Sequence, residues 1–206
     1  MSPRKYDRSL RNLNREETKR RIVEAAFRLH GLHGGLATTY PMIARAADVS
    51  VPTVYNHFPT RDDLFGACTR HVPAGAPAIG PAIFDGIAGV EERLSALVRA
   101  LGRNYGFRAP WIRWGSAEAE VVPEFRRFLE EGRKEREALV RAALEPRFGG
   151  RPPAGLIALA DVLLDFGSWD RLASRRGPRR AEALLTESLV VLFHHHARSP
   201  KGDSWP

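Results

Sequence analysis

The sequence predicts an all-α protein of about nine helices, with an N-terminal three-helix domain that contains a helix-turn-helix and a C-terminal helical domain. Three observations lead to this prediction. Residues 39–58 contain two short helical segments joined by a tight turn. Apolar residues recur at helical spacing along most of the remaining chain, and two segments near the C-terminus are apolar on nearly every side. With 206 residues, the chain is long enough for one or two domains with their own cores.

The N-terminal region carries much of the positive charge. Residues 1–30 hold nine Lys and Arg against four Asp and Glu, in a chain of formal net charge +8, which fits a polyanionic partner. Residues 1–13 predict a flexible basic arm, which either reaches DNA or is only a solvated tail. Asn14, with Glu17 three residues later, predicts the start of the first helix, whose first turn would face a phosphate. Gly31 is expected to end that helix.

Two consecutive helix starts are visible in the next segment. Thr39 and Ser50 are typical N-cap residues, and each is followed two residues later by a proline that falls in a first helical turn. In the second helix, Val54 and Phe58 lie four residues apart and are expected in the core. Its other side chains suit base edges, phosphates and thymine methyl groups in a major groove: Val51, Pro52, Thr53, Tyr55, Asn56 and His57.

A set of residues at fixed offsets runs through this segment: Ile43-Ala44, Val49-Ser50, Thr53-Val54-Tyr55, His57-Phe58 and Thr60-Arg61-Asp62-Asp63-Leu64. In this order they resemble the DNA-binding domain of the tetracycline-repressor (TetR) family, over roughly Asn14 to Phe65. Two positions depart from the family pattern. Asp48 stands where the family usually has Gly, in a turn that Asp tolerates in a left-handed conformation, and Arg61 replaces a common Lys with its charge kept.

The resemblance implies a homodimeric transcriptional regulator, expected to be a repressor, that binds a near-palindromic double-stranded DNA operator. Residues 50–58 of each subunit, beginning with Ser50, would enter successive major grooves ~34–36 Å apart. We expect base contacts from Val51, Pro52, Thr53 and Asn56, among which the Asn56 amide is suited to pair with adenine. Phosphate contacts are expected from Thr39, Tyr55, His57 and Arg61.

The sequence next predicts the boundary between the domains. Thr60 and Asp63 form a capping box that opens a helix at Arg61, expected to run to about His71. This helix is the one obvious link between the DNA-binding domain, residues 14–70, and the helical domain, residues 71–197. Seven Pro and Gly residues between positions 73 and 89 predict a loop.

Within the helical domain, apolar spacing predicts a helix over residues 94–105, a short segment opened by Pro110 and a long helix opened by Pro123. Two final helices are expected over about residues 153–173 and 178–195. Because both are apolar nearly all round, a second copy of the chain is expected to cover them in a four-helix contact, and the resemblance implies the same. Residues 198–206 are expected to be a disordered tail.

Aromatic residues are concentrated in the helical domain, where the resemblance implies an inducer pocket without fixing its residues. Pockets for small molecules are mostly apolar walls with a few polar groups. We expect a small hydrophobic or amphipathic ligand that releases the repressor, with candidate lining residues Tyr105, Trp111, Arg113, Trp114, Glu118, Phe128, Asp165 and Trp169. A DNA-binding regulator controlled by a protein partner, without small-molecule input, is the alternative.

Enzymatic motifs are mostly absent from the sequence, which has no Gly-rich phosphate loop, no metal-spaced cysteine cluster and no nucleophile elbow. The adjacent His194, His195 and His196 would point in different directions on a helix, so no metal is expected, and no cofactor is implied. A helical enzyme that uses Asp165 with these histidines is the weakest interpretation. One cysteine, Cys68, no signal peptide and no membrane-length apolar stretch favour the cytoplasm.

Overall fold

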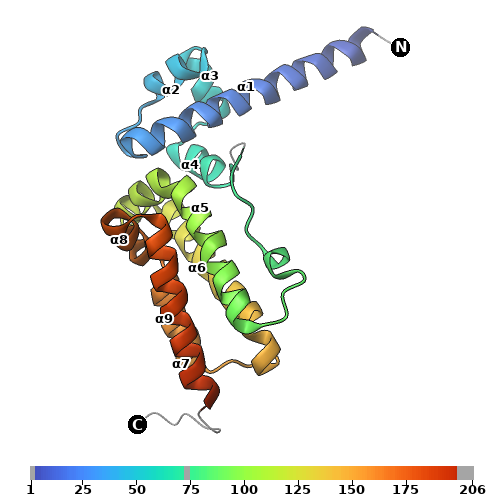
Figure 1. The fold of residues 1–206 in the computed structure, drawn as a ribbon. Coiled ribbons are helices and arrows are strands. Elements are labelled where there is room, and N and C mark those ends of the chain that lie inside the picture. Colours follow the sequence, from blue (N-terminus) through green and yellow to red (C-terminus); the bar gives the residue numbers. More distant parts are fainter. Residues whose placement is uncertain (1–2, 72–74, 199–206) are drawn as a thin grey trace. The chain divides into compact units, whose positions relative to one another are not determined.

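The computed structural model describes residues 3–71 and 75–198, and every regular element within these ranges is helical (Figure 1). In chain order the elements are α1 (Pro3–His33), α2 (Tyr40–Ala47), α3 (Val51–His57), α4 (Arg61–Thr69), the 3-10 helix η1 (Pro81–Phe84), α5 (Val90–Glu118), α6 (Pro123–Phe148), α7 (Ala154–Leu164), α8 (Phe166–Arg176) and α9 (Pro178–Arg198). The predicted all-α class is confirmed.

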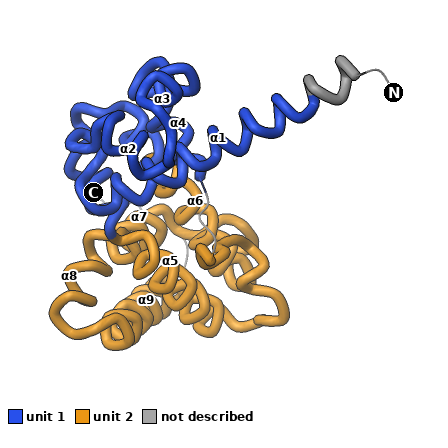
Figure 2. The backbone as a smooth tube through the Cα atoms, turned by 90° about the horizontal axis from the view of Figure 1, so that it is seen from above, with its two compact units in different colours: residues 1–74, 110–129 blue, residues 75–109, 130–206 orange. Residues whose placement is uncertain are grey.

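The chain forms two compact units, which Figure 2 shows in different colours. Unit 1 holds α1 to α4 together with Pro110–Leu129, which are the end of α5 and the beginning of α6. Unit 2 holds Gly75–Ala109 and the residues from 130 onward. Two helices, α5 and α6, therefore contribute to both units.

The core of unit 1 is built around the predicted apolar positions. α1 packs against α2 and α4, and α2 packs against α3. Ile22, Ile43 and Val54, from the first three helices, are completely buried in one cluster. A second cluster joins Phe65 of α4 to Val122 and Phe125 near the start of α6. The helix-turn-helix is thus supported from the side opposite to its exposed surface.

Helix α1 is longer than the sequence predicts. It begins at Pro3 and not at Asn14, so residues 3–13 are helical and not an irregular arm. The helix also continues past Gly31, because Gly34 is the residue with a positive φ of 84°, and its N–H donates to the carbonyl of His30 at 2.9 Å. No proline or glycine interrupts residues 4–30, so nothing in the local sequence stops the helix earlier.

Helix α5 runs without interruption through Pro110, where the sequence predicts a new segment. An interior proline removes one backbone hydrogen bond and strains the preceding turn. Tyr105 and Ile112, on either side, are each only 7% exposed, so packing holds both halves of α5 in place. Tertiary contacts therefore outweigh the local preference to break.

The first of the two predicted final helices is divided in the structure. α7 ends at Leu164, Asp165 has an extended backbone, and its Oδ2 accepts a hydrogen bond from the Gly167 N–H at 2.7 Å as the N-cap of α8. The last helix, α9, continues to Arg198, so the first residue of the tail predicted over residues 198–206 is helical, and residues 199–206 lie outside the described residues.

Unit 2 is held together by helix packing and by one largely buried ion pair. α7, α8 and α9 pack on one another. The guanidinium of Arg136 on α6, which is 9% exposed, donates to Asp161 on α7 at 2.7 Å. Among the residues that the structure describes, no helix is both long and apolar enough to cross a membrane.

Candidate nucleic-acid interface

The turn between α2 and α3 is fixed by caps at both helices. The Thr39 hydroxyl accepts from the Met42 N–H at 3.5 Å at the start of α2, and the Ser50 hydroxyl accepts from the Thr53 N–H at 3.2 Å at the start of α3. Between them Asp48 is left-handed, with φ 53° and ψ 54°, as the sequence predicts. These local bonds determine how α3 leaves α2.

Helix α3 has one face in the core and one face exposed. Val54 is completely buried and Phe58, just after the helix, is 3% exposed, while the Tyr40 hydroxyl donates to the carbonyl of Phe58 at 2.8 Å. Tyr55 is 54% exposed, and its ring lies 4.6 Å from that of Tyr40. The other predicted contact residues on α3 are exposed or half-buried: Pro52 and Asn56 are exposed, and Val51, Thr53 and His57 are half-buried.

Arg61, predicted as a phosphate contact, is engaged inside unit 1. Its guanidinium donates to the carbonyl of Gly35 at 2.7 Å and to that of Leu36 at 2.8 Å. The guanidinium carbon also lies 5.6 Å from the centre of the Phe65 ring. Arg61 thereby binds the loop between α1 and α2.

Glu118, predicted as a pocket residue, holds the other side of the same loop. The side chain lies at the end of α5 and is 8% exposed, and its carboxylate accepts from the Gly35 N–H at 2.9 Å and from the Leu36 N–H at 3.2 Å. A Cβ at Gly34 would meet a Glu118 oxygen at 2.5 Å, and one at Gly35 would meet the Phe125 ring at 2.7 Å. The loop therefore requires both glycines. We call Glu118, Arg61 and the loop residues 34–38 that lie between them the loop clamp.

A second contact from α5 reaches the core of the helix-turn-helix domain. The Trp111 indole N–H donates to the carbonyl of Phe27 at 2.6 Å, and the two rings stack with their centres 4.3 Å apart. Nearby, His30 is buried and contacts Phe65, and burial, followed by the charge of Arg61, lowers the pKa of His30 to about 4. The end of α5 is thus part of the support for α1.

The eight candidate pocket residues are divided between the two units. Unit 1 contains Trp111, Arg113, Trp114, Glu118 and Phe128, and unit 2 contains Tyr105, Asp165 and Trp169. In unit 2 the Tyr105 hydroxyl donates to the carbonyl of Leu164 at 2.7 Å, and burial raises the pKa of Tyr105 to about 12. The indole N–H of Trp169 is buried and has no hydrogen-bond partner among the residues that the structure describes.

The histidines near the C-terminus point to separate partners. His194 Nε2 lies 3.0 Å from a carboxylate oxygen of Glu91, whereas His196 Nδ1 lies 2.9 Å from the carbonyl of Leu192. In the described part of the chain, no three His, Cys, Asp or Glu side chains are grouped so that they could hold a metal ion.

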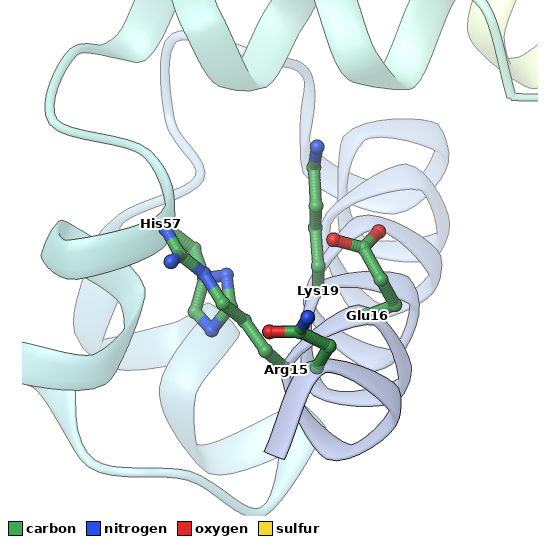
Figure 3. A pocket seen from close by; sticks show the side chains of 5 residues that line it. Arg15, Glu16, Lys19 and His57 are labelled. Carbon is green, nitrogen blue, oxygen red and sulfur yellow. The ribbon is translucent and has the colours of Figure 1, made fainter. Parts of the chain in front are cut away.

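A polar hollow of about 210 Å³ lies between α1 and the end of α3 (Figure 3). Asn12, Arg15, Glu16 and Lys19 line it from α1, and His57 lines it from α3. The prediction from sequence included His57 but missed the four α1 residues. Their spacing of i, i+3, i+4 and i+7, which places them on one helix face, is the signal that could have found them.

Comparison with known proteins matches the segment that contains the helix-turn-helix to bacterial regulatory proteins. Residues 22–68 match the family described as "Bacterial regulatory proteins, tetR family". The HTH-type transcriptional regulator BetI of Rhizobium meliloti is 33% identical over 115 residues, which are 54% of this chain and 56% of that protein. The match thus spans little more than half the length of this curated relative.

Two solved structures share the fold. A TetR-family transcriptional regulator from Mesorhizobium loti is 22% identical, with a TM-score of 0.57 over 88% of this chain and 97% of that one. The multidrug binding protein EbrR, solved in complex with proflavin, is also 22% identical, with a TM-score of 0.55 over 85% of this chain and 99% of that one.

Two capped helices around a left-handed turn, with an exposed polar face on the second helix, define a helix-turn-helix protein. The sequence match covers that motif, and the solved structures share the all-helical fold on either side of it. Over residues 22–68, the chain is thus similar to the tetR family of bacterial regulatory proteins.

The loop clamp leads to a prediction for stability. Glu118→Ala leaves two backbone N–H groups without their acceptor, so we expect the free energy of unfolding to fall by about 2–3 kcal/mol. Urea denaturation measures this change. Glu120→Ala, at an exposed position two residues later, is the matched control and should change stability by less than about 0.5 kcal/mol. Equal stability of the two variants would contradict the role of Glu118.

Proposed function

We propose that this protein is a homodimeric transcriptional repressor that binds a near-palindromic operator through α3. The observation that carries the proposal is the exposed face of α3, where Pro52, Tyr55 and Asn56 stand opposite the buried Val54. A short helix with polar and small apolar groups on its free face suits a major groove. BetI is named as a transcriptional regulator, which is consistent with the proposal.

The roles of individual residues follow from their chemistry and exposure. We assign base contacts to Val51, Pro52, Thr53 and Asn56, and phosphate contacts to Thr39, Ser50, Tyr55 and His57. Arg61 receives a different role from the one the sequence predicts, because the guanidinium binds the carbonyls of the α1–α2 loop. We propose that Arg61 positions the helix-turn-helix.

A second copy of the chain is the proposed partner of α7 and α9. Val162 on α7 is 64% exposed, Leu159 on the same helix is 46% exposed and Val191 on α9 is 63% exposed. A dimer through these helices would remove this apolar surface from water and would present two copies of α3 to the operator.

We place ligand binding in unit 2, around Trp169. This residue is 5% exposed, and its ring centre lies 5.8 Å from Tyr105 and 6.2 Å from Phe166. A buried indole N–H without a partner costs about 1–3 kcal/mol, which an oxygen acceptor on an aromatic or amphipathic ligand would recover. Because α5 contributes to both units, its displacement would reach Glu118 and the loop clamp.

We propose that this protein acts as a regulator and not as an enzyme. It would act in the cytoplasm, where bacterial DNA lies. The alternative regulator, controlled by a protein partner, requires no ligand in unit 2. A ligand that binds unit 2 and weakens operator binding would favour the ligand-controlled regulator over the regulator controlled by a protein partner.

Operator selection tests the DNA-binding function. Duplexes selected from a random pool by the purified protein, at one fixed moderate salt concentration, should be enriched in a near-palindrome. Asn56→Ala should relax the preference at one base position in each half-site by about 1–3 kcal/mol, because only the amide contact is removed. Arg113→Ala, an exposed position on α5, is the control and should select the same duplex. Salt-sensitive binding without enrichment of any sequence would contradict the proposal.

Sedimentation equilibrium tests the dimer. Val162→Glu would bury a carboxylate against apolar side chains, so we expect the dissociation constant of the dimer to rise by at least about tenfold. Val121→Glu, at a position in unit 1 that is 67% exposed, is the matched control and should leave the dimer intact. A Val162→Glu protein that dimerises as tightly as this control would place the interface elsewhere.

Calorimetric titration tests the ligand site with two aromatic probes, 1-anilinonaphthalene-8-sulfonate and proflavin, both added without DNA. We expect the sulfonate, which carries oxygen acceptors, to bind several-fold more weakly to Trp169→Phe, because this substitution keeps an aromatic ring but removes the N–H donor. Trp114→Phe, at a 41% exposed tryptophan in unit 1, should bind the probe as the unchanged protein does. If neither probe binds the unchanged protein, or if Trp169→Phe and Trp114→Phe bind the sulfonate with equal affinity, the result would count against this site.

A further inference from the structure

The hollow between α1 and His57 has the charges of an anion site. Arg15 and Lys19 contribute two cations and Glu16 contributes one carboxylate, so the fixed charges leave a positive excess before His57 is counted. In Figure 3 the Arg15 side chain extends from α1 toward His57. Asn12 adds an amide that can donate a hydrogen bond.

The position of the hollow indicates which anion it would take. His57 is the last residue of α3 and directly follows Asn56, so the hollow adjoins the surface that we propose enters the major groove. A groove is bordered by the phosphates of the DNA backbone, and Lys, Arg, Asn and backbone or ring N–H groups are the donors that usually contact them.

Resting on the proposed DNA-binding function, we propose that this hollow holds one backbone phosphate of the operator and that His57 takes up a proton when the phosphate binds. Arg15 and Lys19 are cations in the free protein and in the complex. His57 becomes a third cation only in the complex. The operator would therefore be bound more tightly in mildly acidic solution.

The surroundings of His57 explain why the proton would arrive with the DNA. Burial, followed by the positive charges of Arg15 and Lys19, lowers the pKa of His57 in the free protein, while Glu16 raises it. All three charged groups lie on α1, and α3 itself contains no Asp, Glu, Lys or Arg. A phosphate in the hollow would offset the two cations and attract a proton to the imidazole, so the pKa of His57 is higher in the complex.

This linkage has a definite sign. Between the lower pKa of free His57 and the higher pKa of bound His57, the imidazole is neutral in the free protein and charged in the complex. In that interval affinity rises as the pH falls, by at most about tenfold per pH unit. Below both pKa values the imidazole is charged in both states, and above both it is neutral in both, so the dependence on this group ends.

Operator affinity measured by fluorescence anisotropy from about pH 5.5 to 8, at constant ionic strength, tests the proposal. The unchanged protein should bind more tightly as the pH falls, and His57→Gln, which keeps a polar side chain without a titrating group, should lose this increase. Buried His30, with its pKa of about 4, titrates below this range. An unaltered pH profile in His57→Gln would overturn the proposal.

Salt dependence tests the two fixed cations. The double variant Arg15→Ala, Lys19→Ala should weaken binding to all duplexes alike and make the slope of log affinity against log salt shallower by about one. Arg28→Ala is the matched control, because Arg28 is exposed and lies nine residues after Lys19, on the opposite face of α1. A double variant that keeps the affinity and slope of this control would overturn the phosphate assignment.

Nuclear magnetic resonance gives the most direct test, since it titrates the His57 imidazole in the free and operator-bound protein. A higher pKa in the complex supports the proposal, and an equal or lower pKa overturns it. A rise caused by inorganic phosphate alone, without a rise in the operator complex, would assign the hollow to free phosphate and would also overturn it. The DNA sequence preference of the same protein samples separates the proton linkage from the proposed function. If the protein prefers one operator sequence but the pKa of His57 does not rise, the regulator stands without the proton linkage. If the unchanged protein prefers no sequence, the proposed function fails.

Discussion

The orientation of the helix-turn-helix depends on the loop clamp, in which opposite charges hold the two sides of one short loop. The Glu118 carboxylate accepts from the N–H groups of Gly35 and Leu36, and the Arg61 guanidinium donates to the carbonyls of the same two residues. Hydrogen bonds to charged groups are stronger than those between neutral ones, and buried backbone groups without partners are costly. Because α2 begins at Tyr40, shortly after this loop, the clamp sets the starting point of the motif that presents α3.

The clamp residue Glu118 lies on a helix that also belongs to unit 2. α5 carries Glu118 and Trp111 in unit 1 and Tyr105 in unit 2, so one continuous helix belongs to both units. A ligand that favours one position of α5 would have to supply only the ~1–3 kcal/mol typical of coupling between sites. A displacement of α5 would thus be a second route by which a ligand could act on the helix-turn-helix. The first is α4, which the sequence identifies as the one obvious link between the domains.

Local rules made the helix-turn-helix predictable from sequence. The caps at Thr39 and Ser50, the capping box of Thr60 with Asp63 and the left-handed Asp48 all involve residues within three positions of one another. The loop clamp was not predictable, because Glu118 bonds to a residue 83 positions away, and the sequence alone predicts Glu118 to be a pocket residue. The α1 side of the hollow was missed for the same reason, since these residues meet His57 roughly 40 positions further along the chain. Packing decided the path of α5 through Pro110.

In the proposed complex, a dimer presents two copies of α3 to two half-sites one helical turn apart. The most direct measurement is the affinity for the selected operator and for a second duplex in which about five base pairs are inserted between the half-sites, half a helical turn. We expect the insertion to lower affinity to nearly that of a single half-site, because the second α3 would face the wrong side of the duplex. An affinity that is independent of this spacing would contradict the proposed arrangement of the two α3 helices.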